Sequence, residues 1–247
     1  MNAIAVAAPA GSRQLHKFGG SSLADVKCYL RVAGIMAEYA KPGDMMVVSA
    51  AGSTTNQLIS WLKLSQTDRI SAHQVQQALR RYQSDLITGL LPPEMAEPLI
   101  ASFIHDLERL AVLLDGKMTD AIYAEVVGHG EVWSARLMSA VLCKLELPAA
   151  WLDAREFLRA ERAAQPQVDE GRSYPLLQQL LAQHPQQYLV VTGFIARSDA
   201  GETVLLGRNG SDYSATQIGA LANASRVTIW SDVAGVYSAD PRKVKDA

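Results

Sequence analysis

The sequence predicts an α/β protein, a three-layer αβα sandwich with an open, mostly parallel central sheet. Short apolar runs alternate along the chain with longer segments in which apolar residues recur at helical spacing. Runs that are apolar throughout are typical of strands that helices cover on both faces. Polar turns, several of them rich in glycine, follow these runs. Because open parallel sheets bind ligands at the carboxyl ends of their strands, we expect the functional residues in those turns.

The first predicted unit is a strand over residues 15–18, a tight turn at Gly19 and Gly20, and a helix from about Ser22. A helix N-terminus after a glycine turn presents unpaired N–H groups and the positive end of the helix dipole, which suits a phosphate. Lys17 adds a positive charge beside them. This lysine precedes the glycines, whereas in the usual nucleotide-binding loop it follows them. A tight turn without a ligand is the alternative, and Lys17 favours phosphate.

The second unit contains a strand over residues 45–48, a hydroxyl-rich turn over residues 49–56 and a helix through residues 58–62. Residues from about 71 to 115 then have the apolar spacing of two helices, which Leu91-Pro92-Pro93 separates. We interpret this helix pair as an insertion over the sheet. Such a pair can serve as a lid over a site or simply pack against the sheet.

A further helix is predicted over residues 123–145, and it contains Gly128 and Gly130. Glycine inside a helix costs roughly 1 kcal/mol relative to alanine, so the two glycines predict a bend or a close approach of another part of the chain. Residues 159–173 are compatible with a loop or with a β-ribbon. The remaining predicted elements are strands at residues 149–152, 188–192, 203–206 and 227–230, and a helix over residues 214–222.

Composition and charge exclude several classes of protein. The formal net charge is -2 and 19% of the residues are charged, so we expect neither nucleic acid nor an anionic membrane as a partner. No apolar run reaches the roughly 18–20 residues that cross a bilayer. Residues 1–13, predicted as a disordered leader, lack the basic and apolar regions of a signal peptide.

The metal-ligating residue types are few and badly spaced for a metal site. Cys28 and Cys143 are predicted to be buried free thiols in a reducing compartment. The five histidines have no paired ligand spacing, so no metal-ligating residue is assigned. We therefore expect a cytoplasmic protein.

Five motifs follow one another in the chain, and together they resemble the aspartokinase signature within the amino acid kinase family. They are residues 17–22 (KFGGSS), residues 48–50 with 55–56 (VSA and TN), residues 130–131 (GE), residues 207–213 (GRNGSDY) and residues 231–242 (SDVAGVYSADPR). The resemblance extends from about residue 14 to residue 247. In detail the chain is similar to the N-terminal kinase portion of bifunctional aspartokinase–homoserine dehydrogenases.

The resemblance implies the amino acid kinase fold and a specific reaction. Aspartokinases transfer the ATP γ-phosphoryl group to the side-chain carboxylate of L-aspartate and form 4-phospho-L-aspartate. This is the first step of lysine, methionine and threonine biosynthesis. ATP and Mg²⁺ are the implied cofactors, since the triphosphate charge must be screened.

The same resemblance assigns the catalytic and substrate-binding residues. Lys17 matches the lysine that bridges the transferring phosphoryl group, and Asp212 matches the acid that organises it. Arg208 matches the arginine that binds the substrate α-carboxylate through two parallel hydrogen bonds. Glu131 matches the acid that pairs with the α-ammonium group. The other residues assigned to the substrate site are Ser49, Thr55 and Ser211.

The nucleotide-binding residues are assigned in the same way. The amides of Gly19 and Gly20, together with Lys17, match contacts to the phosphates. The remaining nucleotide contacts are Ser231, Asp232, Tyr237 and Arg242.

Two departures from the family pattern affect these assignments. Asn209 stands where glycine is common, although asparagine tolerates positive φ well. The sequence ends at Ala247, whereas family members continue through regulatory domains and, in the bifunctional type, a dehydrogenase. We therefore expect residues 14–247 to be a C-terminally truncated catalytic domain with its helical insertion at about 71–115, normally joined to those domains. A homo-oligomer is left open.

Two other functions are compatible with these residues. One is a kinase for another small amino-acid carboxylate, such as glutamate or an N-acetylated amino acid. Glu131 disfavours an acylated substrate, because that substrate has no ammonium group to pair with it. The other is a non-catalytic, nucleotide-binding fragment of a larger bifunctional enzyme, which would bind nucleotide without turnover.

Overall fold

The computed structural model describes residues 13–207 and 209–231, and its centre is a parallel sheet. Among these residues the sheet has five strands in the order β3-β4-β2-β1-β7, and every neighbouring pair is parallel. The predicted α/β class and parallel sheet are therefore confirmed. The strands are β1 (Gln14–Phe18), β2 (Met45–Val48), β3 (Ala149–Leu152), β4 (Tyr188–Thr192) and β7 (Arg226–Trp230).

The strands next to one another end at the same level, which brings their following turns together. Phe18, the last residue of β1, pairs with Val48 of β2 and with Trp230 of β7. Val48 in turn pairs with Thr192, the last residue of β4. Four strands thus end in register at one edge of the sheet, and the polar turns predicted from the sequence begin there.

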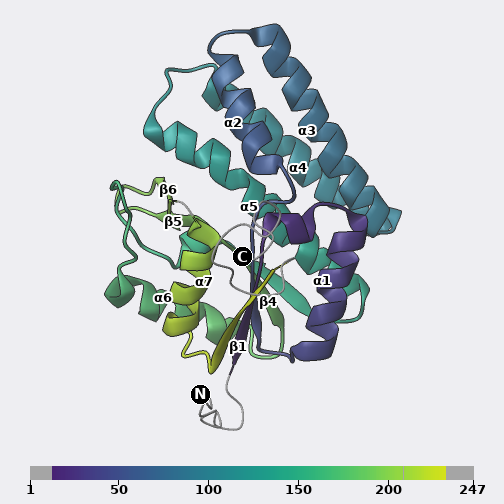
Figure 1. Cartoon of the computed structure of the whole chain (residues 1–247), viewed down its shortest axis with the longest axis vertical. Helices are drawn as coiled ribbons and strands as arrows, with labels where there is room; N and C mark the ends of the chain where they lie inside the picture. Colours follow the sequence, from purple (N-terminus) through teal and green to yellow (C-terminus); the bar gives the residue numbers. More distant parts are fainter. Residues whose placement is uncertain (1–12, 208, 232–247) are drawn as a thin grey trace, which may run out of the picture.

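Helices cover both faces of the sheet, as Figure 1 shows. One apolar cluster joins α1 and α5 to one face and includes Met36, Met138 and Val190. The cluster on the other face joins α6 and α7 to the sheet. The three predicted layers are confirmed. The helical elements are η1 (Gly20–Leu23), α1 (Val26–Tyr39), α2 (Thr54–Ser65), α3 (Arg69–Leu90), α4 (Pro93–Leu114), α5 (Asp120–Lys144), η2 (Ala154–Glu156), α6 (Glu170–Gln183) and α7 (Gly210–Leu221).

Three helices form a separate group beyond the end of the sheet, visible at the top of Figure 1. Here α2, α3 and α4 pack around a third apolar cluster, to which α5 contributes Val126 and Trp133. The two helices predicted between residues 71 and 115 are present as α3 and α4. Since α5 packs on this group and also covers the sheet, it joins the two parts of the molecule.

The first helix begins later than the sequence analysis predicts. The glycine turn continues into the short 3-10 helix η1, in which the Ser22 N–H donates to the Gly19 carbonyl. The α-helix starts at Val26 because Asp25 caps it: the Asp25 carboxylate accepts the N–H of Cys28 at 2.8 Å. The predicted start at about Ser22 is therefore wrong.

The glycines of α5 mark close contacts. α5 is continuous through Gly128 and Gly130. A Cβ on Gly128 would lie 2.6 Å from a methyl carbon of Ile195, and one on Gly130 would lie 2.7 Å from the Cβ of Ala50. The predicted close approach is confirmed, and it places α5 directly against the turn that follows β2.

The segment whose structure the sequence left open is mostly irregular. Two isolated bridges tie it to the rest, Arg159 to Arg197 and Ala160 to Val168. The helix α6, which the sequence analysis did not predict, begins at the end of this segment. The predicted strand at residues 203–206 is present as β6 (Thr203–Leu205), paired antiparallel with β5 (Ile195–Arg197) in a hairpin beside the main sheet.

The two cysteines are not both buried. Cys28 is half-buried and Cys143 is exposed, because Cys143 lies in the last turn of α5. The prediction of two buried thiols is therefore wrong. Over residues 13–207 and 209–231, no helix combines the length and the apolar character that a membrane span requires.

Candidate active site

The polar turns at the carboxyl edge of the sheet surround a cavity of about 320 Å³. The lining residues come from the end of β1 and the turn after it, from the turn after β2 and the start of α2, from α5, from Phe194 after β4, and from the loop before α7 and its first turn. Eight residues that the sequence analysis assigned to a site line this one cavity. They are Lys17, Gly19, Gly20, Ser49, Thr55, Glu131, Ser211 and Asp212.

An ion pair stands on one side of the cavity. Lys17 is the fourth residue of β1 and is almost fully buried, and its Nζ lies 2.6 Å from Oδ1 of Asp212. Asp212 belongs to the first turn of α7, where helix N–H groups and the positive end of the dipole also lie. A lysine and a helix N-terminus at one place form a site suited to a phosphate group.

The glycine turn (residues 19–25) and the hydroxyl turn (residues 49–56) touch each other directly. The N–H of Gly52 donates to the Gly20 carbonyl at 2.9 Å. A Cβ on Gly20 would lie only 2.7 Å from the Ala50 carbonyl oxygen. Gly20 therefore has to be glycine for the two turns to lie this close.

Glu131 supplies a buried carboxylate on another side of the cavity. Its side chain is 3% exposed, and its Oε1 accepts the N–H of Ala50 at 3.2 Å. Its Oε2 has no hydrogen-bond partner among the described residues. Burial raises the pKa of Glu131 to about 8, against the smaller opposite effect of the Ala50 N–H. A buried carboxylate with one unsatisfied oxygen in a cavity suits a cationic group of a ligand.

The loop before α7 has a left-handed backbone at a residue that tolerates it. Asn209 is the N-cap of α7 and has a φ of 56°, in the left-handed region. Asparagine tolerates this conformation, so its replacement of the common glycine is accommodated. Gly210 follows in direct contact with the ring of Phe194, where a Cβ would collide. The helix that carries Ser211 and Asp212 is thereby held against the residues after β4.

Sequence reasoning did not assign six of the residues that line the cavity to the site: Ala50, Gly52, Phe194, Gly207, Asn209 and Gly210. Ala50 and Gly52 follow β2, and Phe194 follows β4, so the position of each after a strand end was the available signal. Phe194 has a φ of 67°, and its N–H donates to the hydroxyl of Ser214 at 3.0 Å.

Other assigned residues are not brought to this cavity. Ser231 follows β7 and is not among the residues that line it. Arg208, Asp232, Tyr237 and Arg242 lie outside the residues that the structure describes. Their assigned roles remain predictions.

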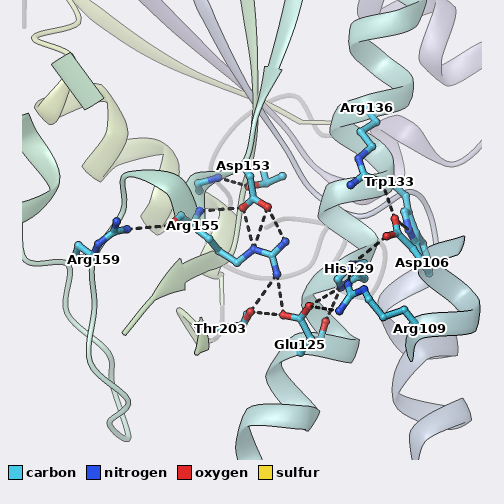
Figure 2. Close-up of polar contacts among 12 residues, drawn as sticks. Asp106, Arg109, Glu125, His129, Trp133, Arg136, Asp153, Arg155, Arg159 and Thr203 are labelled. Carbon is cyan, nitrogen blue, oxygen red and sulfur yellow. Dashed lines mark hydrogen bonds and ion pairs between the residues drawn. The ribbon is translucent and has the colours of Figure 1, made fainter. Parts of the chain in front are cut away.

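A partly buried charge network is centred on Glu125 of α5, less than two turns before Glu131, and Figure 2 shows it. Arg155, just after β3, donates to Glu125 at 2.8 Å, and Thr203 of β6 also donates to Glu125. Arg155 forms a second ion pair with Asp153 at 2.6 Å. Burial acts to raise the pKa of Glu125, but the positive charge of Arg155 and further partners outweigh it and lower the pKa to about 2.

His129 extends this network to α4. Its Nδ1 lies 2.9 Å from the Glu125 carbonyl, and its Nε2 lies 2.7 Å from a guanidinium nitrogen of Arg109. Because a guanidinium only donates, Nε2 must accept and Nδ1 must carry the proton. Burial lowers the pKa of His129, in keeping with this neutral form. The network ties α5 to α4, to the segment after β3 and to the hairpin.

The fold and the cavity define a class of protein. A parallel α/β sheet carries, at its carboxyl edge, a lysine and a helix N-terminus for phosphate and a buried carboxylate for a cation. This arrangement suits the binding of a phosphate group together with a small, amino-bearing molecule. The model of the amino acid kinase family matches residues 12–247, and the chain belongs to that family.

Curated relatives agree with the resemblance seen in the sequence. The chain is 83% identical over 247 residues to the bifunctional aspartokinase/homoserine dehydrogenase 2 of Escherichia coli (strain K12), which covers all of this chain and 30% of that protein. It is 35% identical over 240 residues to the chloroplastic bifunctional aspartokinase/homoserine dehydrogenase of Daucus carota, covering 94% of this chain and 26% of that protein. The chain thus spans less than a third of the length of these relatives.

A solved structure agrees as well. Aspartokinase III of E. coli, in complex with aspartate and ADP, superimposes with a TM-score of 0.86 at 30% sequence identity. The superposition covers 94% of this chain and 52% of that one. The predicted fold and the predicted family are both confirmed.

Proposed function

We propose that this chain is the catalytic unit of an ATP-dependent aspartate kinase. The observation that carries the proposal is the buried carboxylate of Glu131, with its unsatisfied Oε2, in the same cavity as the Lys17–Asp212 ion pair. Such a cavity has a place for a cationic amino group and a place for a phosphate. The solved relative with aspartate and ADP supports the same pair of ligands.

In this proposal the substrate is held by charges opposite to its own. Glu131 pairs with the α-ammonium group of L-aspartate and is ionised in the complex. Arg208 binds the α-carboxylate, an assignment that rests on the GRNGSDY motif. Ser49, Thr55 and Ser211 line the same cavity as Glu131, and in this proposal their hydroxyls donate hydrogen bonds to the substrate.

The chemical step is transfer of one phosphoryl group. An oxygen of the aspartate side-chain carboxylate bonds to the γ-phosphorus, the bond from that phosphorus to the bridging oxygen breaks, and ADP leaves. Lys17 and the amides of Gly19 and Gly20 stabilise the negative charge on the transferring group. Asp212 holds the Lys17 ammonium in place through their 2.6 Å contact.

The residues present fit a Mg²⁺ ion that arrives with the nucleotide. Among the described residues no group of three or more His, Cys, Asp or Glu could hold a metal ion. Mg²⁺ is commonly bound by one or two carboxylates together with substrate phosphates and water, and Asp212 offers one carboxylate beside the phosphate place. When bound, the ion neutralises phosphate charge. Ser231, Asp232, Tyr237 and Arg242 complete the proposed nucleotide contacts.

The relatives support a wider setting for this activity. We propose that the kinase works joined to C-terminal regulatory and dehydrogenase domains; the name of the bifunctional relative supports the dehydrogenase. We also propose that it works in the cytoplasm. Association between copies stays a prediction, which sedimentation of the purified chain tests.

The decisive experiment measures ADP release with Mg-ATP and one acceptor at a time. We expect turnover with L-aspartate and none with N-acetyl-L-glutamate, which lacks the free ammonium group that Glu131 requires. L-Glutamate should not turn over either, because its extra methylene moves the side-chain carboxylate away from the position that the carboxylate of aspartate takes. Lys17→Ala should lower kcat by on the order of 10²–10³-fold. Turnover with the acetylated acceptor would instead support a kinase for another carboxylate. Nucleotide binding without turnover on any acceptor would support a non-catalytic module.

A further inference from the structure

Two consecutive residues of α3, Tyr82 and Gln83, each hydrogen-bond to one of the two turns that form the cavity wall. Neither of them lines the cavity. Tyr82 binds the glycine turn and Gln83 binds the hydroxyl turn. The helix that carries them belongs to the group beyond the sheet, so the contacts connect that group to the candidate active site.

Tyr82 touches both turns at the point where they meet. Its hydroxyl donates to the Ala24 carbonyl at 2.9 Å, at the end of the glycine turn. The same oxygen lies 2.7 Å from where a Cβ on Gly52 would be, so it packs directly against the hydroxyl turn. Partial burial raises the pKa of Tyr82 to about 12, and the hydroxyl therefore keeps its proton at any physiological pH.

Gln83 holds the hydroxyl turn from its other end. Its side chain is 2% exposed, and its amide nitrogen donates to the hydroxyl of Thr54 at 3.0 Å. That hydroxyl donates in turn to the Ala51 carbonyl at 2.6 Å. The methyl group of Thr54 lies 3.2 Å from where a Cβ on Gly130 would be, next to Glu131. Through Thr54, Gln83 thus holds the same turn whose Ala50 N–H donates to Glu131.

We propose that α3 sets the spacing between the glycine turn and the hydroxyl turn, and that Tyr82 and Gln83 are positioning residues for phosphoryl transfer. The proposal rests on the proposed function, because it assigns phosphate to the first turn and acceptor to the second. A displacement of about 1 Å between reacting groups can lower a rate by about 10²-fold. Two side chains that fix the two turns to one helix hold them within such limits.

The first test replaces the Tyr82 hydroxyl while keeping its ring. Tyr82→Phe should lower kcat about 10-fold and change both KM values by less than about 3-fold, because the turns still bind their ligands but align them less well. Gln83→Met should act in the same direction. Tyr174→Phe, at a half-exposed tyrosine of α6 away from the cavity, is the matched control and should leave kcat unchanged. A kcat of Tyr82→Phe within twofold of the control would overturn the proposal.

A double-substitution cycle isolates the contact itself. Gly52→Ala places a methyl group against the Tyr82 hydroxyl and should be far more damaging to kcat alone than in a chain that also carries Tyr82→Phe. The positive φ of Gly52 penalises alanine equally in both backgrounds and cancels in the comparison. Equal effects in the two backgrounds would show that the hydroxyl does not set the position of the turn.

Amide hydrogen exchange tests the positioning without any activity. The N–H groups of Ser22, Gly52 and Thr54 are hydrogen-bonded within or between the two turns. In Tyr82→Phe they should exchange at least about 5-fold faster than in the wild-type chain, while α6 stays unchanged. If the wild-type chain fails to phosphorylate aspartate yet this change occurs, the proposed function falls and the positioning role stands. Unchanged exchange would overturn the positioning role.

Discussion

At the scale of single residues, Glu131 has the most informative environment in the molecule. Its pKa of about 8 means that in the unliganded chain it is mostly neutral at pH 6 and increasingly ionised toward pH 8. Pairing with an ammonium group requires the ionised form. Binding of L-aspartate below pH 8 should therefore release a proton.

The first prediction concerns the pH dependence of this binding. The KM for L-aspartate should fall by up to about tenfold per pH unit between pH 6 and pH 8 and then level off, because less work is needed to ionise Glu131 as the pH rises. Glu131→Gln should raise KM and flatten this dependence. Steady-state kinetics at constant ionic strength provides the measurement, with the KM for ATP as the internal control. A pH profile that survives in Glu131→Gln would assign the proton to another group.

The residues of the site were predictable where a local motif carries them. Lys17, Glu131 and Asp212 come from three distant motifs, and the parallel sheet with its even strand ends brings them to one cavity. The position of Phe194 after a strand end was the only signal for it, and its positive φ could not be predicted because its side chain is not one that favours that conformation. Tyr82 was not predicted either. Its spacing in the helix is that of any core residue, and nothing in the neighbouring sequence indicates a contact with Ala24, 58 positions away.

At the scale of elements, α5 contacts more parts of the molecule than its sequence pattern suggests. Its buried residues surround it on all sides, because it packs on the sheet, on the helical group and on the hairpin. Gly130 is the position where it meets the hydroxyl turn. The sequence predicted this close approach from two glycines in one helix, but could not identify the partner.

The second prediction compares two glycines in helices. Gly130→Ala forces a methyl group to within 2.7 Å of the Ala50 Cβ, so it should destabilise the chain by about 1–3 kcal/mol and lower kcat/KM for aspartate by displacing Ala50 from Glu131. Gly34→Ala, in α1, is the control: its Cβ would meet no described atom within 4 Å. It should stabilise the chain by about 0.5–1 kcal/mol, since alanine favours a helix. Urea unfolding of both variants measures the difference, and destabilisation of equal size in the two would contradict the role of the contact.

The elements that the sequence missed share one physical cause. The α6 helix begins in a polar segment with internal Pro175, and β5, the strand of the hairpin that was not predicted, has only three residues. Such short or mixed segments have too few periods to distinguish a helix or strand from a loop. Their structure comes from packing on the sheet, as the buried Leu177 of α6 and Ile195 of β5 show.

At the scale of the whole molecule, the network around Glu125 joins parts of the chain that the sheet does not. Glu125 accepts from Arg155, which follows β3, from Thr203 of the hairpin and from Arg109 of α4 (Figure 2). The helical group and the sheet are thus connected by charges as well as by α5. Such a network stabilises the molecule only while the central carboxylate stays ionised.

The third prediction is that Glu125 stabilises the folded chain in a pH-dependent way. Its folded pKa of about 2 lies below its usual 4.5, so its contribution is fully present above pH 4.5 and is lost as the pH falls toward 2. Glu125→Gln should lower the free energy of unfolding by about 3 kcal/mol at pH 7, because it breaks a largely buried ion pair. This loss of stability lies at the lower end of the range for broken buried ion pairs, because Arg155 keeps its ion pair with Asp153 and is not left without a partner.

Glu202→Gln is the matched control for this prediction, because Glu202 forms an ion pair with Arg162 at 2.8 Å in which both side chains are about two-fifths exposed. Exposed pairs of this kind contribute at most about 1 kcal/mol. Urea unfolding at pH 7, 5 and 4 should show a wide gap between the free energies of unfolding of the two variants at pH 7 and pH 5, and the gap should begin to narrow at pH 4.

The direction of this pH dependence distinguishes Glu125 from Glu131. The contribution of Glu131 to folding stability is fully present below its usual pKa of 4.5 and is lost as the pH rises from 4.5 through 8. The contribution of Glu125 is lost in the opposite direction, as the pH falls from 4.5 toward 2. The unliganded chain should therefore be most stable in a mildly acidic range between the two, and a stability that rose steadily from pH 5 to pH 8 would contradict the assigned state of Glu131.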